Sequence, residues 1–82
     1  MDYFTYILYS KHIDKFYVGY TGLSLVERLN KHNTNHKGYT GKTNDWEVIY
    51  FEKFTSKSEA YEREREIKSK KSRRYIEKLI AG

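Results

Sequence analysis

The stretch YFTYILYSKHIDKFYVGYT, residues 3–21, contains two apolar and aromatic segments separated by a short polar break. Tyr3 to Ser10 and Lys15 to Thr21 are both rich in the aromatic and β-branched residues that favour strands. Because the break between them is short, the two segments predict an antiparallel β-hairpin. A loop with an even number of residues places Tyr6 and Tyr17 on the same face of the sheet, since side chains alternate between the two faces.

Two helix starts are marked by a serine with a glutamate three residues later. This pattern is called a capping box. Ser24 with Glu27 forms the first pair, and Ser56 with Glu59 forms the second. The helices are expected to run to about residues 33 and 69. A loop is expected over residues 34–45, a third strand over 46–54 and a short final helix over 72–79. The order β-β-α-β-α-α predicts one α+β domain, residues 1–82, with a small three-stranded antiparallel sheet flanked by helices.

Composition excludes several kinds of site and location. The 82-residue chain has no cysteine, so it can form neither a disulfide framework nor a cysteine-ligated zinc site. Cysteine-free composition suits a reducing compartment. The first residues lack the basic segment of a signal peptide, and no apolar run approaches the roughly 20 residues needed to span a bilayer. We therefore expect a cytoplasmic protein with no membrane partner.

Positive charge is concentrated in the last third of the chain. The sequence has 16 Lys and Arg against 11 Asp and Glu, and residues 57–82 hold nine and five of these. Such a patch predicts an anion-binding surface, with nucleic acid as the first candidate, although a solvated helix face has the same composition. The basic residues expected to contact nucleic acid are Lys68, Lys70, Lys71, Arg73 and Arg74.

One glutamate of the second helix falls on its apolar side. At about 100° per residue, with Ala60 at 0°, Ile67 lies at about 340° and Glu64 at about 40°. Glu62 and Glu66 fall on the opposite face. A carboxylate in an apolar setting costs several kcal/mol unless it is paired or binds a metal. Glu64 therefore needs a positive partner, which is either a metal ion or a nearby Lys or Arg.

Arg28 and His32 stand four residues apart in the first helix and present a cation and an imidazole to one place. Both groups suit a phosphate or its leaving group, although a solvated helix flank has the same spacing. His32 and His36 are also four apart, but a zinc site is not expected with so few histidines and no cysteine.

The tyrosine pair adds a third candidate group. A tyrosine with an ordinary pKa of about 10 is a poor base at neutral pH. A divalent cation close by would make it a plausible one. Two core tyrosines would give the same pattern, so Tyr6 and Tyr17 taken alone leave both interpretations open.

Taken together, these residues resemble the GIY-YIG nuclease family. The elements that carry the resemblance are Phe4-Thr5-Tyr6, Tyr17-Val18-Gly19, Arg28, His32 and Glu64. The run Lys31-His32-Asn33, the strand from Trp46 to Tyr50 and the helix from Ser58 to Lys68 are similar to the small stand-alone bacterial branch of that family. This branch is related to the N-terminal domain of excinuclease C and to structure-selective endonucleases. The first tripeptide departs from Gly-Ile-Tyr, but it keeps the tyrosine.

The resemblance implies a metal-dependent endonuclease that hydrolyses phosphodiester bonds in DNA. The relatives just named extend this expectation to structure-selective cleavage linked to DNA repair or recombination. The resemblance also implies one Mg²⁺ or Mn²⁺ on Glu64, no small-molecule cofactor, and catalytic roles for Tyr6, Tyr17, Arg28 and His32. Tyr6, or with less support Tyr17, would deprotonate water, Arg28 would stabilise the phosphoryl charge, and His32 would assist proton transfer or orient a tyrosine.

Two other functions stay open from the sequence. One is a non-catalytic nucleic-acid-binding module that retains the nuclease fold, and the other is a structural protein that binds a protein partner. The sequence does not decide between duplex, branched and flapped DNA or RNA, and it leaves the oligomeric state open.

Overall fold

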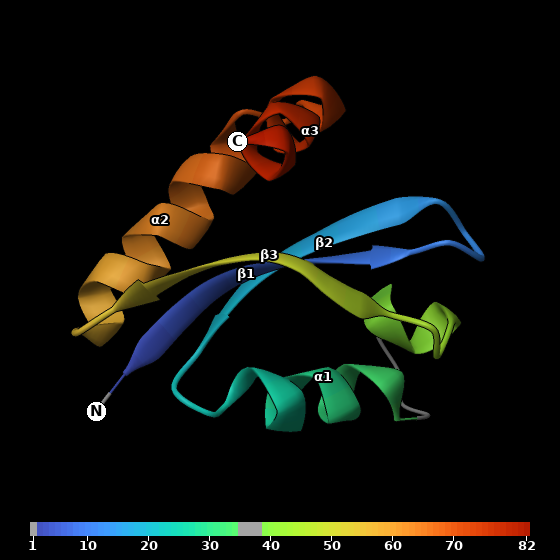
Figure 1. The fold of residues 1–82 in the computed structure, drawn as a ribbon, viewed down its shortest axis with the longest axis horizontal. Coiled ribbons are helices and arrows are strands. Elements are labelled where there is room, and N and C mark those ends of the chain that lie inside the picture. Colours follow the sequence, from blue (N-terminus) through green and yellow to red (C-terminus); the bar gives the residue numbers. More distant parts are fainter. Residues whose placement is uncertain (1, 35–38) are drawn as a thin grey trace.

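The architecture was obtained from a computed structural model that describes residues 2–34 and 39–82 (Figure 1). Two strands come first, β1 (Tyr3–Ser10) and β2 (Lys15–Thr21), followed by helix α1 (Leu25–Asn33) and the short 3₁₀ turn η1 (Tyr39–Lys42). Strand β3 (Glu47–Phe54) and helices α2 (Lys57–Ser69) and α3 (Arg73–Ala81) complete the chain. The predicted β-β-α-β-α-α order is confirmed. No helix in the described ranges is long and apolar enough to cross a bilayer.

The sheet is antiparallel and has β1 at its centre, in the order β2-β1-β3. In the pairing of β1 with β2, Tyr6 lies opposite Gly19 and Leu8 lies opposite Tyr17. Tyr6 and Tyr17 therefore share a face, as the hairpin predicted. Strands β2 and β3 are both edges, so groups along β2 are accessible from the side of the sheet as well as from its faces.

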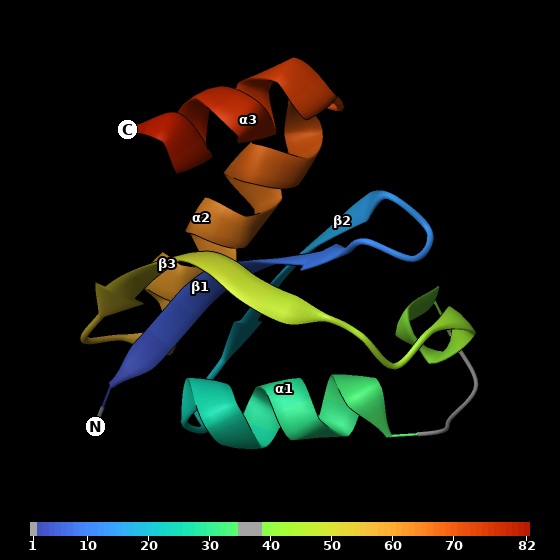
Figure 2. The same ribbon diagram turned by 45° about the vertical axis from the view of Figure 1, so that its right-hand side comes forward.

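The two faces of the sheet carry separate hydrophobic cores, and the helices divide between them. Helix α1 covers one face, and α2 and α3 cover the other (Figures 1 and 2). Under α1 the buried residues are Tyr6, Leu8 and Trp46. Under α2 and α3 they are Ile7, Val18 and Ile67. The alternation along β1 places Tyr6 towards α1 and Ile7 towards α2, which sets the side of the sheet on which each functional group lies.

Side-chain caps fix the helix starts. The hydroxyls of Ser24 and Ser56 accept hydrogen bonds from the backbone amides of Glu27 and Glu59, each at 3.2 Å, so both serines are confirmed as N-caps. The two glutamate side chains accept from the serine hydroxyls, at 3.1 and 3.0 Å. The third strand starts at Glu47, one residue later than expected. The amide of the preceding residue, Trp46, donates instead to the Asn33 side chain at 2.8 Å.

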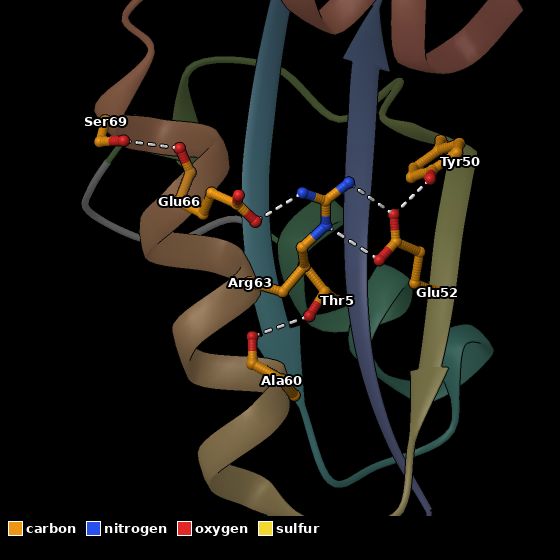
Figure 3. Close-up of polar contacts among 7 residues, drawn as sticks. All are labelled: Thr5, Tyr50, Glu52, Ala60, Arg63, Glu66 and Ser69. Carbon is orange, nitrogen blue, oxygen red and sulfur yellow. Dashed lines mark hydrogen bonds and ion pairs between the residues drawn. The ribbon is translucent and has the colours of Figure 1, made fainter. Parts of the chain in front are cut away.

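On the face of the sheet that α2 covers, a polar network holds this helix against the strands (Figure 3). The guanidinium of Arg63 binds both carboxylate oxygens of Glu52 on β3, at 2.9 and 3.0 Å, and Glu52 also accepts from the Tyr50 hydroxyl. Thr5 on β1 donates to the carbonyl of Ala60 at 2.8 Å. These bonds from two strands fix the rotation of α2 about its own axis, and that rotation decides where Glu64 points.

Burial opposes ionisation of Glu52. The bonds from Arg63 and Tyr50 outweigh that effect and hold the pKa of the Glu52 carboxyl below its ordinary value. Glu52 is therefore a charged anchor for Arg63 at neutral pH. A bidentate pair of this kind also specifies geometry, because the planar guanidinium fixes the orientation of its partner. Among the charged residues of α2, Arg63 therefore has a structural role, since it holds the helix against β3.

Candidate active site

The Tyr6 hydroxyl is the centre of a buried polar cluster between β1 and α1. The tyrosine is 1% exposed. Its oxygen lies 2.7 Å from Nε2 of His32 and accepts a hydrogen bond from Nε of Arg28 at 3.2 Å. Because an arginine can only donate, the hydroxyl proton is available to His32, and a neutral imidazole protonated at Nδ1 satisfies all three groups. The structure therefore brings together Tyr6, Arg28 and His32, three of the residues for which the family resemblance implied catalytic roles.

The spacing of Arg28 and His32 explains how one helix supplies both groups. Residues four apart lie one above the other on a helix, and α1 packs against the sheet directly over Tyr6. His32 is 5% exposed and Arg28 is half-buried. The histidine therefore contacts the tyrosine from the protein interior, and the arginine lies at the boundary with solvent.

Tyr17 contacts side chains from both α1 and α2. Its ring lies 5.0 Å from the His32 ring, centroid to centroid, on the α1 side. From α2, the ammonium of Lys68 lies 5.5 Å from the centroid of the same ring. Tyr17 is on the edge strand β2, so side chains from helices on opposite faces of the sheet can meet around it.

Glu64 lies in this same region, with 13% of its side chain exposed. Its Oε2 atom is 3.5 Å from the Lys68 ammonium. The positive partner expected for a carboxylate on the apolar side of α2 is thus present as a lysine. Glu62 and Glu66 are exposed, in agreement with their predicted place on the outer face.

Electrostatics keep the Tyr6 proton in place in the free protein. Burial raises the pKa of the Tyr6 hydroxyl above its ordinary value of 10, Arg28 opposes this rise, and the nearby Tyr17 and Glu64 add to it. Tyr6 is therefore neutral at physiological pH. It can accept a proton from a substrate water only if it passes its own proton to another group, and His32 is within hydrogen-bond distance.

Gly19 provides the space in which the two tyrosines meet. A Cβ atom built on Gly19 would lie 2.6 Å from the Tyr6 hydroxyl oxygen and 3.2 Å from a ring carbon of Tyr17. Any side chain at this position would displace a buried ring. The sequence motif Tyr17-Val18-Gly19 contained the signal, but the contact becomes evident only from the register that places Gly19 opposite Tyr6.

The donor set around Glu64 fits a hard divalent cation. In the described part of the chain, no three His, Cys, Asp or Glu side chains come together as a metal cluster. A single, mostly buried carboxylate such as Glu64 suits Mg²⁺, which commonly takes one or two carboxylates and fills its remaining positions with water and substrate phosphate. Glu64 would hold the ion. His36, which is spaced four residues from His32 but was not expected to form a zinc site with it, lies outside the described residues.

The predicted basic residues have three different surroundings. Lys68 is in the cluster just described, and Lys70, Lys71 and Arg74 are exposed near the junction of α2 and α3. Arg73 makes specific internal contacts, since its guanidinium binds the Asp14 carboxylate at 2.7 Å and lies 4.9 Å from the Phe16 ring centroid. It therefore ties α3 to the β1–β2 hairpin.

Comparison with known proteins identifies the family. The family model described as GIY-YIG catalytic domain matches residues 2–77. The chain is also similar to the solution structure of the UPF0213 protein BH0048 from Bacillus halodurans. The identity is 31%, the TM-score is 0.59, and the match covers 99% of this chain and 84% of that one. No curated protein matches the chain. The chain therefore belongs to the GIY-YIG nuclease family.

Proposed function

We propose that the protein is a metal-dependent endonuclease that hydrolyses phosphodiester bonds in DNA. The observation that carries this proposal is the Tyr6 hydroxyl, held between Arg28 and His32 with Glu64 close enough to influence its pKa. A general base, a group to relay its proton, a cation for the phosphate and a carboxylate for a metal ion are thus present together. A core of packing residues needs none of these in combination.

The geometry supports Tyr6 as the general base. As water attacks phosphorus in line, it transfers a proton to the Tyr6 oxygen while the original phenolic proton moves to Nε2 of His32. The bond from phosphorus to the leaving oxygen breaks, that oxygen takes up a proton from solvent, and the His32 imidazolium returns one to solvent. Arg28 at the solvent boundary stabilises the negative charge on the phosphoryl group. Tyr17, whose ring lies against His32, borders the same space and orients the imidazole.

A Mg²⁺ or Mn²⁺ ion on Glu64 would supply Lewis-acid stabilisation of a phosphate oxygen. The Lys68 ammonium lies 3.5 Å from the Glu64 carboxylate. When the carboxylate takes a metal ion, the lysine ammonium is left a few ångströms away and can bind a phosphate oxygen of the substrate. The proposed substrates are structures that arise in DNA repair or recombination.

The same ion pair favours a second candidate function. A chain in which Lys68 permanently neutralises Glu64 would keep the fold and a basic surface, yet would have no use for a metal ion. Such a protein would be a non-catalytic nucleic-acid-binding module. The two functions differ in one observable, which is metal-dependent cleavage.

The test is cleavage of end-labelled branched, nicked and linear DNA with Mg²⁺, with Mn²⁺ and with EDTA. We expect products only with a divalent ion, and we expect Glu64→Gln to abolish them while DNA affinity in EDTA changes little. Glu62→Gln is the matched control, because Glu62 is an exposed glutamate of the same helix. Cleavage by Glu64→Gln at the wild-type rate would rule out the metal site. DNA binding without cleavage of any substrate would establish the binding-module function.

A further inference from the structure

Helix α2 is divided lengthwise into a basic and aromatic flank and an acidic flank. With Glu64 at 0° and about 100° per residue, Lys57, Lys68, Tyr61 and Arg65 lie between about 20° and 100°. The exposed glutamates of the helix lie between about 160° and 220° on the same scale: Glu59, Glu62 and Glu66. The acidic flank faces away from an approaching polyanion, and Glu64 stands where the basic flank meets the buried side.

An aromatic pair lies beside this basic flank, with Tyr61 exposed and Tyr20 half-buried. The rings of Tyr61 on α2 and Tyr20 on β2 meet edge to face, with centroids 5.4 Å apart and an interplanar angle of 65°. Tyr61 is 42% exposed, which is high for a large apolar ring. Together with Lys57 and Ser58, the two tyrosines line a surface hollow of about 250 Å³.

A guanidinium completes the arrangement. The central carbon of Arg65 lies 5.7 Å from the Tyr61 ring centroid, a cation–π distance. Lys57 and Arg65 thus lie one helical turn before and after Tyr61. Cations next to accessible aromatic rings are the combination by which proteins hold single-stranded nucleic acid: bases stack on the rings, and the phosphates are neutralised. In a duplex the same bases are stacked on one another, and their faces cannot reach a protein ring.

The position of the pair relates it to the candidate active site. Tyr61 precedes Glu64 by three residues, about 4.5 Å along the helix axis, and Tyr20 follows Tyr17 and Gly19 on the edge strand. A strand that presents a phosphate to Glu64 therefore passes Tyr61 with a neighbouring nucleotide. We propose that Tyr20 and Tyr61, with Lys57 and Arg65, form a stacking platform for an unpaired strand, so that the substrate is DNA with a single-stranded segment beside the scissile phosphate. This inference rests on the proposed function for its reference to cleavage.

Binding in EDTA tests the platform separately from catalysis. Fluorescence anisotropy would be measured with a labelled single strand, a flapped duplex and a blunt duplex. We expect the wild type to favour the first two over the blunt duplex. Loss of one base–aromatic stack in Tyr61→Ala should weaken single-strand binding by roughly 5- to 150-fold, with little change for the blunt duplex. Tyr61→Phe keeps the ring and should bind as the wild type does.

The matched control is Phe51→Ala, which removes a ring that is 53% exposed on the opposite edge strand, β3. Its single-strand affinity should equal that of the wild type. Circular dichroism and thermal melting establish that both alanine variants are folded, and Arg65→Gln gives an independent, milder test of the same surface. Equal single-strand affinity of Tyr61→Ala and the wild type, or a wild-type preference for the blunt duplex, would overturn the platform.

The platform and the nuclease can fail independently. If Tyr61→Ala binds single strands normally while Glu64→Gln loses cleavage, the platform is wrong and the proposed nuclease stands. If no DNA is cleaved but Tyr61→Ala loses single-strand affinity, the platform stands as a binding surface and the nuclease falls.

Discussion

Tyr6 and His32 share a 2.7 Å hydrogen bond, from the phenolic oxygen to Nε2, across the interface between the central strand and the first helix. Both side chains are at least 95% buried. A buried polar pair of this kind specifies geometry, because either partner left alone would lose its hydrogen bond without regaining water. The pair therefore serves the packing of α1 on the sheet as well as the proposed proton relay, and an experiment has to separate these two roles.

Substituting phenylalanine for each tyrosine makes that separation. Tyr6→Phe should lower the cleavage rate by roughly 10²–10⁴-fold, the usual contribution of general acid–base catalysis. It should also cost about 1–3 kcal/mol of stability, because His32 loses a buried hydrogen-bond partner. Single-turnover cleavage at a temperature where both proteins are folded measures the catalytic part alone.

Tyr17→Phe is the comparison, since it removes a hydroxyl from the neighbouring ring. We expect a smaller loss of rate than for Tyr6→Phe. The reverse order would identify Tyr17 as the general base. If both variants cleave at the wild-type rate, the tyrosines are core residues and have no role in proton transfer.

Gly19→Ala should affect the site without altering any polar group. The new Cβ would lie 2.6 Å from the Tyr6 oxygen, and the Tyr6 ring is enclosed by the core. Relief of such a contact in a packed core costs about 1–3 kcal/mol and would shift the hydroxyl relative to His32. Thermal melting and cleavage should both report a loss.

Gly22 provides the control for Gly19→Ala. It is an exposed glycine just after the same strand, and a Cβ atom built on it would lie 3.0 Å from a ring carbon of Tyr3. Gly22→Ala should leave cleavage near the wild-type rate. Normal activity of Gly19→Ala would mean that Tyr6 can move without consequence, which contradicts a role for its position beside His32.

The hairpin, the capped helices, the shared face of Tyr6 and Tyr17 and the common side of Arg28 and His32 could be predicted because each depends on a local pattern. The meeting of the two pairs was implied only by the family resemblance. Side-chain directions repeat every two residues in a strand and every 3.6 residues in a helix, so the spacing in the sequence fixes the face on which each side chain lies. Glu64 was placed by the same argument. The Gly19 contact depends on the register that places Gly19 opposite Tyr6, and the Tyr20–Tyr61 pair depends on how α2 crosses β2. Neither could be predicted from a local period. Lys68 follows Glu64 by four residues on one helix, a spacing that allows an ion pair, but the sequence left open whether the partner of Glu64 is a basic side chain or a metal ion.

The basic segment illustrates the limit of composition. Arg73 and Arg74 are neighbours and look equivalent in the sequence, yet it is Arg73 that bonds to Asp14 and to Glu77. Charge density predicts a surface, and it does not tell a side chain that binds a distant carboxylate from one that extends into solvent. The two arginines are consequently expected to differ on substitution.

Changing Lys70, Lys71 and Arg74 together to alanine should weaken DNA binding for all sequences. A plot of log affinity against log salt concentration has a negative slope. For every phosphate that the protein no longer neutralises, the magnitude of this slope should decrease by about 0.9 on duplex DNA. Arg73→Ala should instead lower the melting temperature, because it releases α3 from the hairpin. Affinity measured over a salt series and thermal melting distinguish the two effects. An unchanged salt slope in the triple variant would exclude this segment from the DNA interface.

The ion pair of Lys68 with Glu64 leads to a prediction about metal binding by the free protein. The ammonium lies 3.5 Å from the carboxylate that is proposed to hold the ion, so a divalent cation has to displace a positive charge. Lys68→Met removes that charge and keeps a long side chain against the Tyr17 ring. Relief of the Coulomb repulsion should tighten Mn²⁺ binding by about three- to tenfold at moderate ionic strength, as measured by calorimetry without DNA.

Cleavage should move in the opposite direction at saturating Mn²⁺, because the lysine is then missing from the substrate phosphate. Lys70→Met is the control, since its ammonium lies 5.5 Å from the Tyr75 ring centroid, with no carboxylate contact among the described residues, and its Mn²⁺ affinity should match the wild type. Equal Mn²⁺ affinity in Lys68→Met and the wild type, with no binding by Glu64→Gln, would show that the lysine does not compete with the metal. A variant that binds Mn²⁺ more tightly but cleaves more slowly would show that Lys68 opposes the ion in the free protein and assists the substrate in the complex.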